Sequence, residues 1–253
     1  MPRRSASPGH SPPRQGRSAR RPAGQGRRAD IRRTAVRRVQ RLLLLIIALA
    51  VAASVWSLWQ MARDGQGPLW LALIFGPPQT LTDRSIGIVA GHSGNDSGAV
   101  CPDGLTEAAV NQAVAEAVVQ ALRRRGAAVD LLQEFDGRLR GYRGDAFVSI
   151  HADSCQVELS GFKVASLAGG SRASSQLAAC LWDRYTFATG LKPHPDTITY
   201  DMRGYHAFRE IAADTPAAII EIGFLKADRE LLTQRQEQVV AGIVTGIECF
   251  LQR

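Results

Sequence analysis

Four side chains suited to hydrolytic chemistry stand close to predicted strand ends or at the start of a predicted helix: His92, Glu107, His151 and Glu221. Two imidazoles and a carboxylate, with a fourth position left open, are the usual protein ligands of a catalytic zinc ion. A further carboxylate that does not bind the metal can serve as general base for the attacking water. These residue types therefore indicate metal-assisted hydrolysis.

Each of these residues also has a more ordinary explanation when taken alone. A histidine near a strand end is more often a hydrogen-bonded structural residue than a ligand. A glutamate in the first turn of a helix, as Glu107 is predicted to be, commonly just complements the helix dipole. The compact signature H-E-x-x-H is absent, and the sequence contains no C-x-x-C pair. Spacing alone therefore does not establish a metal site.

The elements that would position these side chains follow an alternating α/β pattern from Ser85 onward. Short apolar runs predict strands, and longer stretches with apolar residues at helical spacing predict helices. The expected strands are 85–90, 128–132, 146–150, 161–168 and 216–222, and the expected helices begin at Glu107 and cover 171–189 and 229–251. This order predicts a twisted, mostly parallel or mixed sheet with helices on both faces. Functional residues in such sheets collect just beyond the strand ends.

Four ordered motifs give the chain a family resemblance. They are residues 91–99 (GHSGNDSGA), 104–107 (GLTE), 149–152 (SIHA) and 216–225 (PAAIIEIGFL). From about Ser85 to the C-terminus the sequence resembles the catalytic domain of the zinc-dependent N-acetylmuramoyl-L-alanine amidases, which trim bacterial peptidoglycan. The departures are modest: the family usually has Asp-Pro where this chain has Val89-Ala90, and a second glycine where it has Ser93.

The resemblance implies a role for each candidate residue. His92, Glu107 and His151 match the family's metal ligands, and Glu221 matches its catalytic glutamate. The implied cofactor is one zinc ion, and the implied reaction on peptidoglycan cleaves the amide between N-acetylmuramic acid and L-alanine. Two other functions stay open: a zinc peptidase acting on a different peptidoglycan bond, and a non-catalytic, membrane-tethered domain that binds glycan or regulates another hydrolase.

Residues 192–208 are expected to form a loop beside the site. His194 and His206 lie in it, and surface or structural roles are favoured for both. Arg203 and Tyr205 are candidates for contact with a stem-peptide carboxylate or a sugar.

The four cysteines are Cys101, Cys155, Cys180 and Cys249, and they allow three complete pairings. A bridge between Cys101 and Cys155 is attractive, because each follows a candidate ligand loop. Free buried cysteines are an equally open interpretation.

The positive charge of the chain is concentrated at its beginning. Residues 1–41 hold 13 Arg and one acid, or +12, which leaves 31 − 13 = 18 bases and 23 − 1 = 22 acids, or −4, for residues 42–253. The composition of this tail predicts disorder. Its charge suits either an anionic polymer or retention of this end in the cytoplasm before a membrane span. The second interpretation is favoured, and no nucleic-acid partner is expected.

The apolar run Leu42–Met61 has no charged residue over its 20 positions and predicts a single transmembrane helix, with a cleaved signal peptide as the alternative. The expected organisation is a tail (1–41), this span (42–61), a linker (62–84) and a catalytic domain (85–253). The expected location is the cell membrane, with the catalytic domain outside the cytoplasm.

Overall fold

The computed structural model describes residues 40–56, 80–155 and 158–253. The chain divides into two compact units, Met1–Asp64 and Gly65–Arg253. In the first unit the described residues form one helix, 40–56, whose apolar side chains are exposed. The predicted disordered tail lies almost wholly outside the described residues, as does most of the predicted linker.

The predicted transmembrane helix over Leu42–Met61 is wrong. Within the described ranges, no helix is both long enough and apolar enough to cross a membrane. The described part of the first helix covers residues 40–56, and residues 57–61 of the expected span lie outside the described residues.

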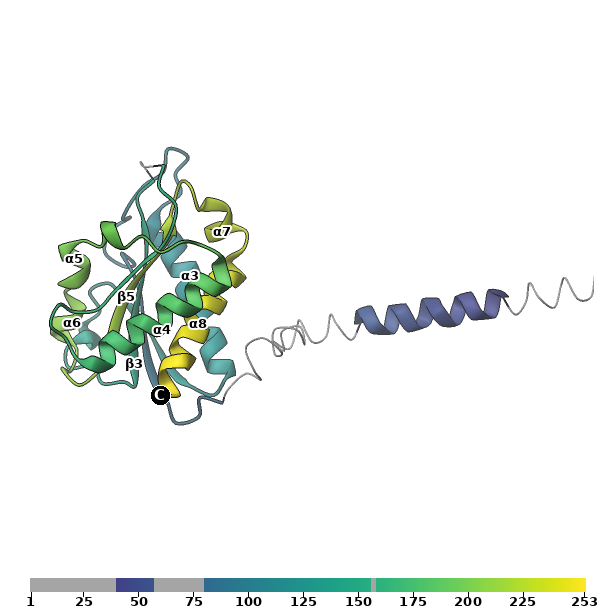
Figure 1. Ribbon diagram of the computed structural model, residues 1–253, viewed down its shortest axis with the longest axis horizontal. Coiled ribbons are helices and arrows are strands. Elements are labelled where there is room, and N and C mark those ends of the chain that lie inside the picture. Colours follow the sequence, from purple (N-terminus) through teal and green to yellow (C-terminus); the bar gives the residue numbers. More distant parts are fainter. Residues whose placement is uncertain (1–39, 57–79, 156–157) are drawn as a thin grey trace, which may run out of the picture. The chain divides into compact units, whose positions relative to one another are not determined.

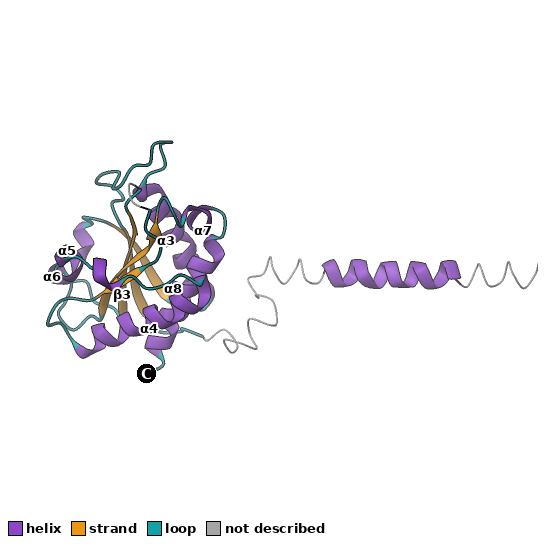
Figure 2. Cartoon of the chain, turned by 45° about the horizontal axis from the view of Figure 1, so that its top comes forward, coloured by secondary structure: helices purple, strands orange, loops and turns teal. Residues whose placement is uncertain are grey.

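The second unit is built on a five-stranded sheet with the order β2-β1-β3-β5-β4 (Figure 1 and Figure 2). The strands are β1 (Ser85–Ala90), β2 (Ala128–Gln133), β3 (Ala146–Asp153), β4 (Lys163–Ala165) and β5 (Ala217–Phe224). The first three and β5 pair in parallel, whereas β4 runs antiparallel to β5. The carboxyl ends of four parallel strands thus meet at one edge, as the predicted mixed sheet requires.

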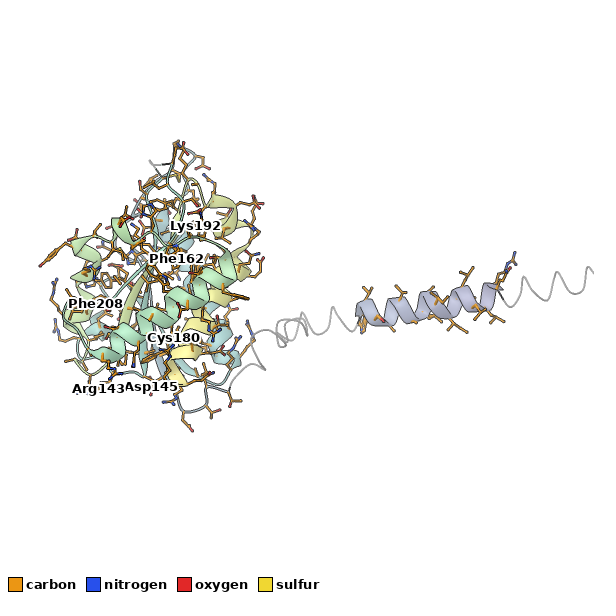
Figure 3. The ribbon with its side chains drawn as sticks, in the orientation of Figure 1. Arg143, Asp145, Phe162, Cys180, Lys192 and Phe208 are labelled. Atoms are coloured by element: carbon orange, nitrogen blue, oxygen red, sulfur yellow. A yellow bond between two sulfur atoms is a disulfide. The ribbon has the colours of Figure 1, made fainter. Side chains whose placement is uncertain are left out.

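Three long helices cover one face of the sheet: α3 (Glu107–Arg124), α4 (Arg172–Thr189) and α8 (Gln236–Leu251). Helices α4 and α8 approach closely because two glycines lie at their contact. A Cβ on Gly242 would come within 2.8 Å of Tyr185, and one on Gly246 within 2.8 Å of Leu181. The disulfide Cys180–Cys249 also joins the two helices, and Figure 3 labels Cys180 on α4.

Shorter elements cover the opposite face. They are the 3-10 turn η1 (Gly137–Leu139) and the single-turn helices α5 (Tyr200–Arg203) and α6 (Ala207–Glu210), and a second 3-10 turn, η2 (Pro195–Thr197), precedes α5. Apolar side chains from η1, α5 and α6 form a second core cluster with residues of the sheet, among them Phe147 and Ile219. Helices therefore flank both faces, as the alternating pattern predicts.

Most predicted elements lie within a residue or two of the observed bounds. The helix predicted at 229–251 forms two pieces, α7 (Arg229–Thr233) and α8. Strand β3 runs three residues beyond its predicted end at Ile150, and β4 is limited to three residues of the predicted 161–168. The extension of β3 matters for the site, because it places His151 inside the strand and in register with Glu221.

Candidate active site

The backbone after β1 places His92 beside His151 of β3, with 5.2 Å between the two ring centroids. His92 has a φ of 64°, in the left-handed region, and its backbone N–H donates to Glu134 Oε2 at 2.8 Å. The residue before it must be glycine, because a Cβ on Gly91 would lie 2.5 Å from the His151 ring. The Gly-His pair therefore lets two imidazoles share one edge of the sheet.

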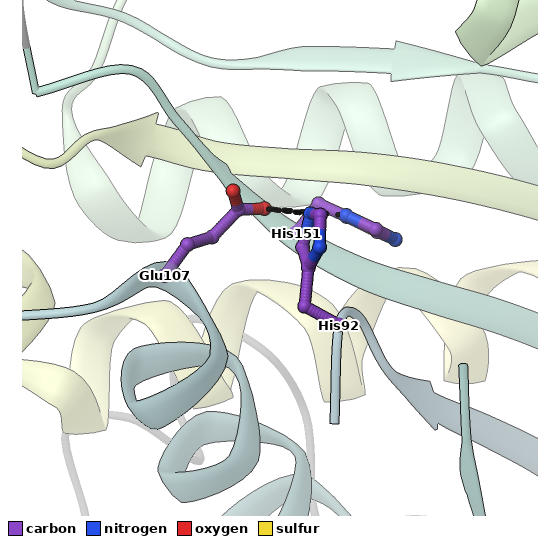
Figure 4. A group of neighbouring side chains, drawn as sticks. All are labelled: His92, Glu107 and His151. Atoms are coloured by element: carbon purple, nitrogen blue, oxygen red, sulfur yellow. Dashed lines mark hydrogen bonds and ion pairs between the residues drawn. The ribbon is translucent and has the colours of Figure 1, made fainter. Parts of the chain in front are cut away.

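The structure brings His92, Glu107 and His151 together, with one ligand atom of each within 4.8 Å of the others (Figure 4). Glu107 Oε1 lies 3.2 Å from His92 Nε2 and 3.2 Å from His151 Nδ1. Ligands placed tetrahedrally around zinc at ~2.0–2.1 Å stand about 3.3 Å apart. The two distances from Glu107 therefore match the spacing of ligands around such an ion.

Helix α3 holds Glu107 at its first position. Thr106 caps the helix by accepting from the Ala109 N–H. Glu107 itself is buried, and its oxygens accept hydrogen bonds from the backbone N–H groups of Ala99 and Ala152. Burial alone would raise its pKa, but the bonds from His151, His92 and Ala99 lower the pKa far below the usual range. Glu107 is therefore a fixed anion.

Acidic neighbours make the two histidines prone to hold positive charge. The bond to Glu107 raises the pKa of His92 to about 9, against the opposing effect of burial. Burial lowers the pKa of His151, but Glu107 and Glu134 outweigh it and raise the pKa to about 10. The cluster therefore attracts cations, which are either protons on the imidazoles or a metal between them.

Each histidine has a carboxylate on the side of the ring away from Glu107. His92 Nδ1 lies 2.5 Å from Asp96 Oδ1, which also accepts from the Gly98 N–H. His151 Nε2 lies 3.5 Å from Glu134 Oε2. Sequence reasoning missed Glu134. The available signal was its place two residues after the strand predicted at 128–132, just as His92 lies two residues after the strand predicted at 85–90.

Glu221 lies on β5 opposite His151, as the strand register requires. Its Oε2 is buried and has no hydrogen-bond partner. Burial is the main cause that raises the pKa of Glu221 to about 7, Glu107 and Asp153 add to it, and His151 and Lys163 oppose it. A carboxyl group with such a pKa can accept and return a proton near neutral pH.

A pocket of about 380 Å³ opens beside Glu221 and His151. Residues of the 199–209 segment line much of it, including Tyr205 and His206, and Glu134 and Ile219 complete the wall. The predicted loop at 192–208 is thus partly helical and does lie beside the site.

Of the secondary candidates, Tyr205 and His206 line the pocket, and His194 and Arg203 do not. Tyr205 is buried and accepts a hydrogen bond from Ser149 Oγ at 3.0 Å, so it also braces β3. His206 pairs with Glu134. His194 packs against Phe224 and contacts Thr197 instead, and neither His194 nor Arg203 lines the pocket.

All four cysteines are paired, and the attractive guess of a Cys101–Cys155 bridge is confirmed. Cys101 lies in the loop between His92 and Glu107, and Cys155 lies four residues after His151. The bridge therefore ties together the segments that carry all three candidate metal ligands.

A family model described as N-acetylmuramoyl-L-alanine amidase matches residues 86–249, well over half of the chain. The chain belongs to the N-acetylmuramoyl-L-alanine amidase family. The matched region contains His92, Glu107, His151 and Glu221. Membership supports a hydrolytic amidase that acts on peptidoglycan.

Solved amidases share this fold. The catalytic domain of CwlV, an N-acetylmuramoyl-L-alanine amidase from Bacillus (Paenibacillus) polymyxa var. colistinus, is 26% identical with a TM-score of 0.53, over 67% of this chain and 98% of its own. The CwlD amidase of Clostridioides difficile, solved with the GerS lipoprotein, is 22% identical with a TM-score of 0.55, and the match covers 67% of this chain and 99% of that chain.

A relative by sequence is the uncharacterized protein YqiI of Bacillus subtilis (strain 168). It is 28% identical over 207 residues, which cover 71% of this chain and 93% of YqiI.

Proposed function

We propose that this amidase hydrolyses the amide between N-acetylmuramic acid and L-alanine, with one zinc ion held by His92, Glu107 and His151 and with Glu221 as general base. The observation that carries the proposal is the family match over residues 86–249, which contains all four residues. The 3.2 Å spacing of the candidate ligand atoms supports zinc as the metal.

Zinc, when bound, supplies a Lewis acid that polarises the scissile carbonyl and acidifies water. Glu221 removes a proton from the attacking water as the new carbon–oxygen bond forms. As the carbon–nitrogen bond breaks, Glu221 returns that proton to the departing L-alanine amine. Its position opposite His151 and its unpartnered Oε2 suit this exchange, because nothing else in the described structure holds that oxygen by a hydrogen bond.

The proposed place of action is outside the cytoplasm. Two disulfides, Cys101–Cys155 and Cys180–Cys249, support it, since disulfides persist in oxidising compartments and are rare in the cytosol.

Digestion of purified peptidoglycan sacculi by the full-length protein tests the reaction. We expect new amino groups on L-alanine and free lactyl groups on muramic acid. New D-amino-acid termini would instead assign the enzyme to another bond, as a peptidase. Binding to sacculi without any cleavage by the zinc-loaded protein would favour the non-catalytic alternative.

Metal removal tests the cofactor. A chelator should abolish hydrolysis, and stoichiometric zinc should restore it. Full activity after verified removal of all bound metal would reject the zinc site.

A further inference from the structure

Glu134 contacts two of the candidate metal ligands, His92 and His151, and also His206 of the pocket wall. It directly follows β2, is buried, and its backbone N–H donates to the Ser93 carbonyl. Its Oε2 accepts from the His92 N–H at 2.8 Å and lies 3.5 Å from His151 Nε2. One carboxylate oxygen therefore faces both candidate histidine ligands.

The two nitrogens of His151 have different surroundings. Nδ1 faces Glu107 within the candidate ligand set, whereas Nε2 is buried and lacks a hydrogen-bond partner. A neutral imidazole that binds a metal through one nitrogen carries its proton on the other. With the metal at Nδ1, Nε2 becomes the donor, and its charged neighbour is Glu134 Oε2.

The second oxygen of Glu134 extends the contacts to the pocket wall. Oε1 lies 3.0 Å from His206 Nε2, and His206 Nδ1 lies 2.9 Å from Glu210 Oε1. Phe135, the residue after Glu134, stacks on the same imidazole at 4.4 Å between ring centroids. Glu134 thus joins the metal side of the site to the start of α6, where His206 lines the pocket.

We propose that Glu134 is a positioning residue for the metal centre: it orients His151 through Nε2 and holds the strained backbone of His92. Such outer carboxylates fix the tautomer and orientation of a ligating histidine, and their loss typically costs about 10- to 100-fold in metal affinity. Glu134 acts through the two histidines and is not itself a ligand, because it lies outside the set that converges on one point. The inference rests on the proposed zinc site.

The test compares zinc affinity in the full-length protein and two variants, by competition with a chelator of known affinity at fixed pH. Glu134→Gln removes the charge while keeping the shape. Glu210→Gln is the matched control, since Glu210 contacts His206 but none of the three candidate ligands. We expect zinc to bind about 10- to 100-fold more weakly to Glu134→Gln and within about threefold of wild type to Glu210→Gln.

A second readout separates positioning from a general loss of stability. In the Co²⁺-loaded protein, the visible absorption band reports the geometry of the ligands. The band should shift in Glu134→Gln and stay unchanged in Glu210→Gln, whereas lower stability alone would leave it in place. If Glu134→Gln does not fold, Glu134→Asp retains the charge at a shorter reach and should lose affinity to a smaller extent.

Unchanged zinc affinity and an unchanged cobalt band in the Glu134 variant that folds would overturn the inference. Failure of the wild-type protein to bind one zinc ion would instead reject the proposed function on which it rests. The two failures are distinguishable because the first appears only in a variant and the second appears in the wild type.

Discussion

The two faces of the sheet are formed by the same strands but are covered differently. Long helices cover one face, and short helices and turns cover the other. Along β5, Ala218, Ile220 and Ile222 point to the long helices and pack in the larger apolar cluster. The alternate residues Ile219 and Glu221 line the pocket beside the short helices. Because side chains alternate along a strand, a single segment supplies both the stable face and the reactive one.

The covering elements are held by different means. Helices α4 and α8 are joined by a disulfide and by close glycine contacts. The 199–210 segment is joined to the sheet in part through side-chain bonds, Tyr205 to Ser149 and His206 to Glu134. This contrast indicates that changes at the α4–α8 contact should alter stability, whereas changes beside the candidate metal ligands should alter chemistry. The predictions below test that division, from the largest expected effect to the smallest.

Glu221→Gln should lower hydrolysis of sacculi by about 10²- to 10⁴-fold, the usual contribution of a general base. Zinc content should stay at the wild-type value, because Glu221 is outside the group formed by His92, Glu107 and His151. Glu116→Gln, on an exposed turn of α3, is the matched control and should keep full activity. Activity within tenfold of wild type in Glu221→Gln would remove its proposed role.

Removal of the two disulfides should have separable effects. Replacing Cys180 and Cys249 by serine should lower the free energy of unfolding by roughly 2–4 kcal/mol while zinc affinity is retained. Replacing Cys101 and Cys155 should lower both, because that bridge connects the ligand-bearing segments. Chemical denaturation and chelator competition measure the two quantities. Equal loss of zinc affinity in both double variants would contradict the separate roles of the two bridges.

The stability of the metal-free protein should depend on pH through Glu221. Its pKa in the folded protein, about 7, is above the ordinary glutamate value of 4.5. The unfolded chain therefore ionises first as pH rises, and the folded state loses stability between about pH 4.5 and 7. Glu221→Gln removes this loss, so its stability advantage over wild type should grow across that window to about 3 kcal/mol.

Denaturant unfolding in excess chelator at a series of pH values measures this advantage. An advantage that is constant from pH 4 to pH 8 would show that burial does not raise the pKa of Glu221.

Gly246→Ala should lower the free energy of unfolding by about 1–2 kcal/mol, since its Cβ would meet the Leu181 backbone at 2.9 Å. Activity at saturating zinc should not change. Gly137→Ala is the control, because nothing lies within 4 Å of the added carbon. Thermal unfolding compares the two variants, and equal melting temperatures would show that the α4–α8 contact can relax.

Some properties followed directly from the sequence. Local apolar periodicity located the strands and the helices to within a few residues, and the four ordered motifs led to the amidase family. The roles of His92, Glu107, His151 and Glu221 remain predictions, although the structure brings the three candidate ligands together. The prediction of a transmembrane helix at 42–61 was wrong, since no helix among the described residues is long and apolar enough to cross a membrane.

Other properties depended on contacts between residues distant in the chain. The cysteine pairing required the loop before Glu107 to lie beside the residues after β3. The bridging place of Glu134 arises because β2 and β3 flank β1 in the sheet, so that the carboxyl ends of three strands converge. Sequence alone determined which chemical groups this protein carries and in what order, since motifs and periodicity are local. Only the tertiary structure decided which of them face one another, because strand order and register are set by packing across the whole sheet.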